Sequence, residues 1–306
     1  MTFTLSVNTN PLVNRFAEPE EFVTVLANEI GIGHIQLVHE FINPSWGAKT
    51  IARLTGRMAA ALSTHKAKIT SAMTGPYGRL NHFGHPDAEV RAYFVKWFKT
   101  YVDIAADLDC PAIGTQFAIL TYRDMDDAVR YRTSMDAALG CWRKVAEHAS
   151  RRGLKYLFWE PMSVARELGH TLQAAKDLQH WIDAAQLPIP LLPMVDIDHG
   201  DVTSANLRDV DPYAWAHDFA TRSPIIHIKQ STMNKGGHWP FTAQYNRDGR
   251  ITPDQLLAAV RAGGGTDNEL CLELAFRERE PTDRNVIAAL KESVAYWAPH
   301  TKTGFN

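Results

Sequence analysis

Short apolar runs of the kind that form β-strands recur about eight times along this chain of 306 residues. Segments with the three- and four-residue periodicity of amphipathic helices lie between most of them. Parallel strands joined by right-handed helical crossovers close into a barrel at this number. We therefore predict an α/β fold, a (β/α)8 TIM barrel made by a single domain over residues 1–306. Its strands are expected at 3–7, 34–38, 68–73, 112–117, 156–160, 191–196, 225–229 and 270–274.

The segment after the fourth expected strand has the clearest helical pattern. Its apolar side chains step by three and four residues from Ala128 to Ala149, and Arg151, Arg152 and Gly153 follow. Cationic side chains favour the last turn of a helix, and glycine readily takes the left-handed conformation that ends one. Other helices are predicted at 20–30, 51–65 and 87–108 and around residues 179, 215 and 257.

The composition is typical of a globular enzyme, with 45% hydrophobic and 22% charged residues. A formal net charge of -2 gives no electrostatic reason to bind nucleic acid or an anionic membrane. The first residues lack the pattern of a signal peptide, and no apolar stretch is long enough to cross a membrane, so we expect a cytoplasmic protein. The three cysteines, Cys110, Cys141 and Cys271, are odd in number and lie in apolar surroundings, which predicts reduced core thiols.

Four apolar runs in the second half end in a side chain that can bind a hard divalent metal ion: Glu160, Asp196, His227 and Glu273. The gaps of 36, 31 and 46 residues fit one β/α unit or slightly more, so the four side chains should meet at one end of the barrel. Taken singly, each could be a helix cap or a solvated loop residue. Together they form an oxygen-rich set with one imidazole, which favours Mn²⁺ or Mg²⁺ and permits Co²⁺ or Zn²⁺. Asp198 is the obvious substitute for Asp196, because it lies two residues further along.

Glu160, the 196–199 stretch, the 227–229 strand and Glu273 together resemble the pattern of the xylose isomerase-like barrels. This superfamily contains sugar isomerases, ketose 3-epimerases and DNA repair enzymes of the endonuclease IV type. The resemblance covers most of the barrel. In the ketose 3-epimerase branch it implies that Glu160, Asp196, His227 and Glu273 hold the metal and that His199 contacts the substrate.

Residues 196–201 and 236–242 are also similar to the erythrulose phosphate epimerases of tetritol catabolism. This narrower resemblance implies a short ketose phosphate, a tetrulose phosphate, as the substrate, and it places His238 among the substrate-binding residues. The expected reaction is inversion of the carbon next to the ketone through an enediolate, with Glu160 and Glu273 as the catalytic base and acid. A keto/aldo isomerase would use the same enediolate, and a free ketose is a further alternative.

The long segment at residues 230–249 follows the seventh expected strand and is predicted to be an irregular loop. TIM barrels often bind phosphate with the loops after strands seven and eight. Lys229, Lys235 and Arg277 could supply the cations there, and the alternative is a lid with solvated lysines. The expected partner is thus a small sugar or sugar phosphate, without nucleic acid or membrane, and a homo-oligomer stays open.

Two classes of protein without this activity are also compatible with such a barrel. A phosphodiester-cleaving repair enzyme should carry further metal-binding His and Glu residues on the earlier strands and a basic face. Only His39 and Glu40 fit such additional metal ligands, and the net charge of -2 does not favour binding to a DNA backbone. A non-catalytic sugar-binding protein would not need two carboxylates that face each other across a metal.

Overall fold

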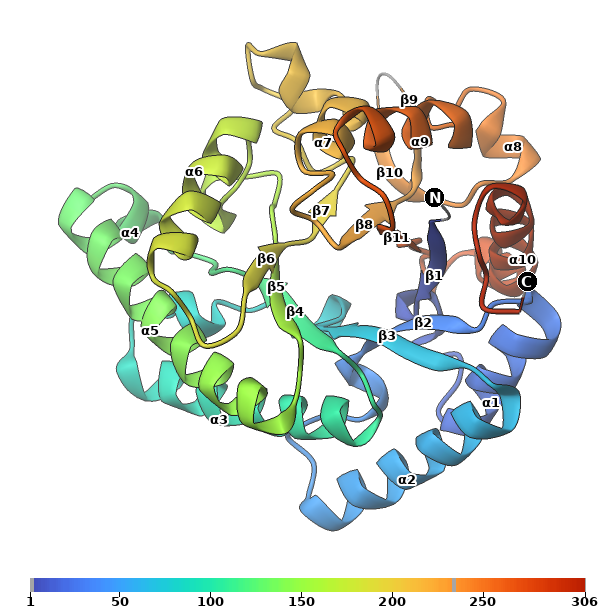
Figure 1. The fold of residues 1–306 in the computed structure, drawn as a ribbon, viewed down its shortest axis with the longest axis horizontal. Coiled ribbons are helices and arrows are strands. Elements are labelled where there is room, and N and C mark those ends of the chain that lie inside the picture. Colours follow the sequence, from blue (N-terminus) through green and yellow to red (C-terminus); the bar gives the residue numbers. More distant parts are fainter. Residues whose placement is uncertain (1–2, 233–234, 306) are drawn as a thin grey trace.

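The computed structural model describes residues 3–232 and 235–305, in which parallel strands form a ring inside a layer of helices (Figure 1). One sheet holds nine segments in the order β6-β5-β4-β3-β2-β1-β11-β8-β7. Their bounds are Thr4–Asn8 (β1), His34–Val38 (β2), Lys68–Met73 (β3), Ala112–Gln116 (β4), Tyr156–Glu160 (β5), Leu191–Pro193 (β6), Val195–Asp196 (β7), Ile225–Ile228 (β8) and Glu269–Leu272 (β11). The predicted TIM barrel is confirmed.

The sixth expected strand is divided at Met194 into β6 and β7. Segment β6 pairs with β5, whereas β7 pairs with β8, so the two ends of the sheet order are the two halves of one strand. Pro193 lies at the break, and proline lacks the backbone N–H that a central strand uses for pairing. The ring therefore closes through a strand that changes its partner halfway along.

The helices cover the outside of the ring, as Figure 1 shows. Their bounds are Pro19–Thr24 (α1), Ala48–His65 (α2), Ala88–Asp107 (α3), Tyr122–Met125 (α4), Ala128–Arg152 (α5), Leu172–Ala184 (α6), Pro212–Asp218 (α7), Ala243–Asn246 (α8), Pro253–Ala262 (α9) and Val286–Trp297 (α10). Helix α1 continues into a π-helical turn at Val25–Ile30. Helix α5 ends as predicted, since Gly153 has a φ of 85° and its N–H donates to carbonyls of the last turn.

The segment after β8 differs from the prediction of an irregular loop. Gln230–Thr232 (β9) and Lys235–Trp239 (β10) form an antiparallel hairpin, and helix α8 follows. The glycines before His238 indicated a loop. A Cβ at Gly237 would lie only 2.6 Å from the Trp239 ring, so glycine is needed there for the Trp239 ring to pack against the strand. The hairpin is joined to the barrel where the Ala275 N–H donates to the His238 carbonyl at 2.8 Å.

Two further predictions concern the core and the membrane. Cys110, Cys141 and Cys271 are buried and form no disulfide among the described residues, as expected for core thiols. Among the described helices, none combines the length and the apolar character that a membrane crossing requires.

Candidate active site

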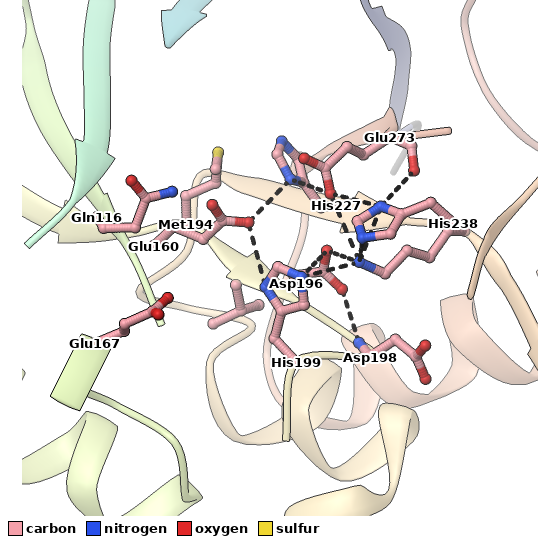
Figure 2. Close-up of polar contacts among 12 residues, drawn as sticks. Gln116, Glu160, Glu167, Met194, Asp196, Asp198, His199, His227, His238 and Glu273 are labelled. Carbon is pink, nitrogen blue, oxygen red and sulfur yellow. Dashed lines mark hydrogen bonds and ion pairs between the residues drawn. The ribbon is translucent and has the colours of Figure 1, made fainter. Parts of the chain in front are cut away.

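The carboxyl ends of the strands bring the four predicted metal ligands together. Glu160 is the last residue of β5, Asp196 is the last of β7, and Glu273 directly follows β11. His227 lies in β8 and is in register with Asp196 on one side and Cys271 on the other. All four side chains are buried. In Figure 2, Glu160 and Glu273 approach the His227 imidazole from its two sides.

Among residues 3–232 and 235–305, four buried atoms of this cluster have no hydrogen-bond partner: Glu160 Oε1, His199 Nδ1, His227 Nδ1 and Glu273 Oε2. They face one another, because His227 Nδ1 lies 3.3 Å from Glu160 Oε1 and 3.4 Å from Glu273 Oε2, and His199 Nδ1 lies 3.5 Å from Glu160 Oε1. Buried carboxylate oxygens and imidazole nitrogens that crowd one another are costly unless a proton or a metal cation lies between them. Asp196 and His199 also belong to a group of side chains with ligand atoms within 4.8 Å of one another. The donor set therefore fits a divalent ion.

Lys229, predicted to contact the substrate, lies inside this cluster and lines the cavity above it. Its ammonium forms an ion pair with Asp196 and lies 3.6 Å from Glu273 Oε2. The same nitrogen is 3.1 Å from His199 Nε2 and 3.2 Å from His238 Nε2. Lys229 is only 1% exposed, so its charge acts almost entirely on these neighbours.

Burial and close charges change the proton affinities of the cluster. Burial raises the pKa of Asp196 to about 6, although the Lys229 ammonium opposes this shift. Burial lowers the pKa of His199 to about 3, helped by the Lys229 charge, so His199 is neutral near pH 7. Burial alone would raise the pKa of Glu273, but the His227 and His238 imidazoles hold it well below its ordinary value. Glu273 is therefore ionised at neutral pH.

The Asp198 carboxylate is held away from the cluster. It forms an ion pair with Arg250 and accepts a hydrogen bond of 3.0 Å from the Ser231 hydroxyl. Asp196 has no arginine partner and instead pairs with Lys229 within the cluster. Of the two aspartates, Asp196 is therefore the one in a position to bind the ion.

A cavity of about 480 Å³ opens above these side chains. Glu160, His199, Lys229, His238 and Glu273 line it. The β9–β10 hairpin supplies His238, whose Nδ1 lies 3.2 Å from Glu273 Oε2. A small polar molecule in this cavity would contact both carboxylates and both histidines.

Gln116, a residue that the sequence reasoning missed, also lines the cavity. It ends β4, pairs in register with Glu160, and lies beside it in Figure 2. Its Oε1 accepts a hydrogen bond of 3.1 Å from Thr115, which leaves its amide N–H groups available to the cavity. The signal was present in the sequence, since Gln116 is a polar residue at the end of a strand, as Glu160 is.

Of the other two cations predicted for the substrate, Arg277 has a described side chain, and it does not line this cavity. The side chain of Lys235 is outside the described part of the structure. Arg277 is exposed and its Nη1 lies 3.0 Å from Glu280 Oε1. It lines a second cavity of about 500 Å³ with Arg15 and Arg279, which we call the arginine pocket. This pocket shares the walls Asn10, Pro76, Leu274 and Ala275 with the cavity above the cluster.

Comparison with known proteins agrees with this geometry. The D-erythrulose 1-phosphate 3-epimerase of Brucella abortus (strain 2308) is 58% identical over 304 residues, which are 99% of this chain and 98% of the relative. Among solved structures, a putative xylose isomerase from Rhodospirillum rubrum ATCC 11170 matches with a TM-score of 0.87 and 24% identity. That match covers 98% of this chain and 99% of the other.

More distant structures share the fold. A D-psicose 3-epimerase from Clostridium cellulolyticum H10, solved with D-tagatose, matches with a TM-score of 0.67 and 14% identity over 96% of this chain and 99% of that one. The IOLI protein with a bound zinc atom matches with a TM-score of 0.65 and 14% identity over 98% and 99% of the two chains. The sequence profile described as xylose isomerase-like TIM barrel matches residues 25–297. Most of the chain is thus covered by one profile, and the protein belongs to the xylose isomerase-like TIM barrel family.

Proposed function

We propose that this protein is a metal-dependent 3-epimerase of a short ketose phosphate, with D-erythrulose 1-phosphate as its substrate. The observation that carries the proposal is the pair of buried carboxylates, Glu160 and Glu273, whose unbonded oxygens both face His227 Nδ1. The relative that is 58% identical over nearly the whole length carries this activity in its name. An identity of 58% over nearly the whole chain supports the predicted enzyme class, an epimerase.

Inversion next to a ketone requires that a carbon-bound proton leaves one face and that another arrives on the opposite face. Two carboxylates that approach from different strands can act as the base and the acid. Glu273 is ionised at neutral pH because the neighbouring imidazoles lower its pKa, so it can accept a proton. Glu160, from β5 on the other side of His227, can serve the opposite face.

Glu160, Asp196, His227 and Glu273 would hold the divalent ion, and His199 lies close enough to join them or to contact the substrate. The ion would supply positive charge that stabilises the negative charge developing on the ketone oxygen. The excess of carboxylate over imidazole favours Mn²⁺ or Mg²⁺, while Co²⁺ and Zn²⁺ are also compatible with the donor set.

Other residues of the cavity can orient the substrate. Neutral His199 can exchange hydrogen bonds with a hydroxyl group, and the free N–H groups of Gln116 can donate to a second oxygen. Lys229 holds Asp196 and Glu273 in place and limits their mutual repulsion. His238, from the β9–β10 hairpin, forms one wall of the cavity and can contact the substrate from that side.

Turnover in D₂O tests the reaction directly. The product of D-erythrulose 1-phosphate should carry one solvent deuterium at C3, because the proton that leaves and the proton that returns bind to different carboxylates. Mass spectrometry and NMR of the separated epimers measure this. An epimer without deuterium would contradict two-base chemistry, and an aldose phosphate as the product would make the enzyme an isomerase.

We place the phosphoryl group in the arginine pocket, since Lys229 is committed to the carboxylate cluster. Arg15 and Arg277 belong to different ends of the chain and meet in this pocket, which adjoins the active-site cavity. Arg277→Gln is expected to raise the KM for the ketose phosphate about 10- to 100-fold and to leave kcat largely unchanged, because a charged hydrogen bond to the phosphoryl group is lost. Steady-state kinetics with phosphorylated and free tetrulose measure the effect.

Arg132→Gln is the matched control, because Arg132 is also exposed but pairs with Asp136 on helix α5, outside both cavities. A wild-type enzyme that prefers the free sugar would contradict the phosphate assignment. An unchanged KM in the Arg277 variant would remove Arg277 from the phosphate site.

A further inference from the structure

A chain of buried amide groups leads from a backbone N–H to the imidazole of His227. The Asn10 N–H donates to Asn8 Oδ1 at 2.7 Å, and Asn8 Nδ2 donates to Gln36 Oε1 at 2.6 Å. Gln36 Oε1 lies 2.7 Å from His227 Nε2. Asn8, Gln36 and His227 have no exposed surface, so bulk water does not compete for these hydrogen bonds.

The direction of each hydrogen bond follows from the first one. A backbone N–H can only donate, so the Asn8 side chain must present its oxygen to Asn10. The Asn8 amide nitrogen then faces Gln36, which must present its own oxygen in return. Since Gln36 Oε1 can only accept, the proton of the His227 ring lies on Nε2.

The other end of the Gln36 amide is held as well. Its Nε2 donates to Ser71 Oγ at 3.0 Å and contacts Met194 Sδ at 3.5 Å. The amide is thus fixed by groups from β1, β3 and the break between β6 and β7, and it cannot turn without losing several contacts. With Nε2 protonated, the neutral His227 ring carries its lone pair on Nδ1, and this is the atom that faces Glu160 and Glu273.

We propose that Gln36 is a positioning residue that fixes the tautomer and the orientation of His227, so that Nδ1 is presented to the metal ion. The proposal rests on the metal dependence of the proposed function. Partners of this kind orient metal-binding histidines in general, and their loss costs about 10- to 100-fold in metal affinity. Gln36 lies in the second strand, 191 residues from His227 along the chain, and does not line the active-site cavity.

Metal affinity of four variants tests this role. We expect Gln36→Met to weaken Mn²⁺ and Co²⁺ binding about 10- to 100-fold, measured by calorimetry, because methionine has no strong acceptor for the Nε2 proton. Gln36→Glu keeps an oxygen acceptor at the same place and adds negative charge beside His227, so it should bind the metal at least as tightly as the wild type. The control is Gln179→Met, because Gln179 is also a buried glutamine but bonds to Trp159 on the far side of β5. It should bind metal as the wild type does.

Asn8→Asp provides a second route that keeps the size of the side chain. The new carboxylate has no N–H for Gln36 Oε1, so the Gln36 amide must turn and direct its N–H groups towards His227. Metal binding should weaken about 10-fold or more, although an added negative charge would by itself strengthen it. The Co²⁺ absorption spectrum of this variant should change as well, because the orientation of a ligand is altered.

Wild-type affinity in both Gln36→Met and Asn8→Asp would overturn the proposal, as would an equal loss in Gln179→Met. If Gln36→Met does not fold, unchanged affinity in Asn8→Asp alone overturns it. A wild-type chain that binds no divalent ion would instead overturn the metal dependence of the proposed function, on which the proposal rests.

Discussion

Glu160→Gln and Glu273→Gln are each expected to lower kcat at least ~10²-fold, the usual scale for the loss of a positioned acid or base. Glutamine keeps the shape of the side chain and an oxygen that can bind the ion, but it does not accept the carbon-bound proton. The two variants should differ in hydrogen exchange. Each variant retains one of the two carboxylates, and that carboxylate can still exchange the C3 proton of the one epimer whose proton points towards it. Kinetics at saturating metal, with deuterium exchange into the substrate, measure both effects.

Asp124→Asn is a suitable control, because Asp124 is equally buried but pairs with Arg130 outside the active-site cavity. Its kcat should stay close to that of the wild type. Full activity in either glutamate variant would contradict the assignment of that residue. Loss of activity together with loss of the bound ion would show a ligand role without proving proton transfer, so the metal content of each variant has to be measured.

Removal of the metal ligands should abolish both metal binding and turnover. The wild-type chain is expected to hold one divalent ion, and His227→Ala and Asp196→Asn should retain less than about a tenth of it after dialysis, because each loses one donor of the set. Activity should fall at least ~10²-fold, and addition of metal should restore it only at much higher concentration. Elemental analysis and kinetics measure these quantities.

Asp198→Asn separates this prediction from a general effect of charge. Asp198 lies two residues from Asp196 and also lines the cavity, but its carboxylate pairs with Arg250. This variant should keep the ion. If it loses the ion while Asp196→Asn keeps it, the ligand set has to include Asp198 in place of Asp196.

Much of the barrel and of the acidic cluster could be predicted from the sequence, because both depend on patterns that are local along the chain. Apolar runs and helical periodicity mark the elements, and the ends of parallel strands must meet. The position of Lys229 also follows from the sequence, since alternate residues of a strand point the same way and Lys229 is two residues after His227. The sequence does not show that four neighbours in the cluster surround its ammonium.

Other features depend on contacts between distant parts of the chain and were therefore not predictable. The β9–β10 hairpin forms where the glycines before His238 indicate a loop, because Trp239 packs where a side chain at Gly237 would otherwise lie. Gln36 lies between apolar residues of strand β2, and its role appears only when His227 is found next to it. The arginine pocket joins Arg15 to Arg277, which no local pattern relates.

The divided strand at Met194 creates a boundary in the barrel wall between β6 and β7, which we call the seam, and it lies beside the active site. On one side of this seam, β5 with Glu160 is attached through β6, and on the other side β8 with His227 is attached through β7. Each attachment involves only two or three residue pairs, as do the β1–β2 and β3–β4 pairings, so neither half of the divided strand is held by a long ladder. An ion bound by both Glu160 and His227 would connect the two sides of the seam, so metal binding would stabilise the closed barrel as well as prepare the active site.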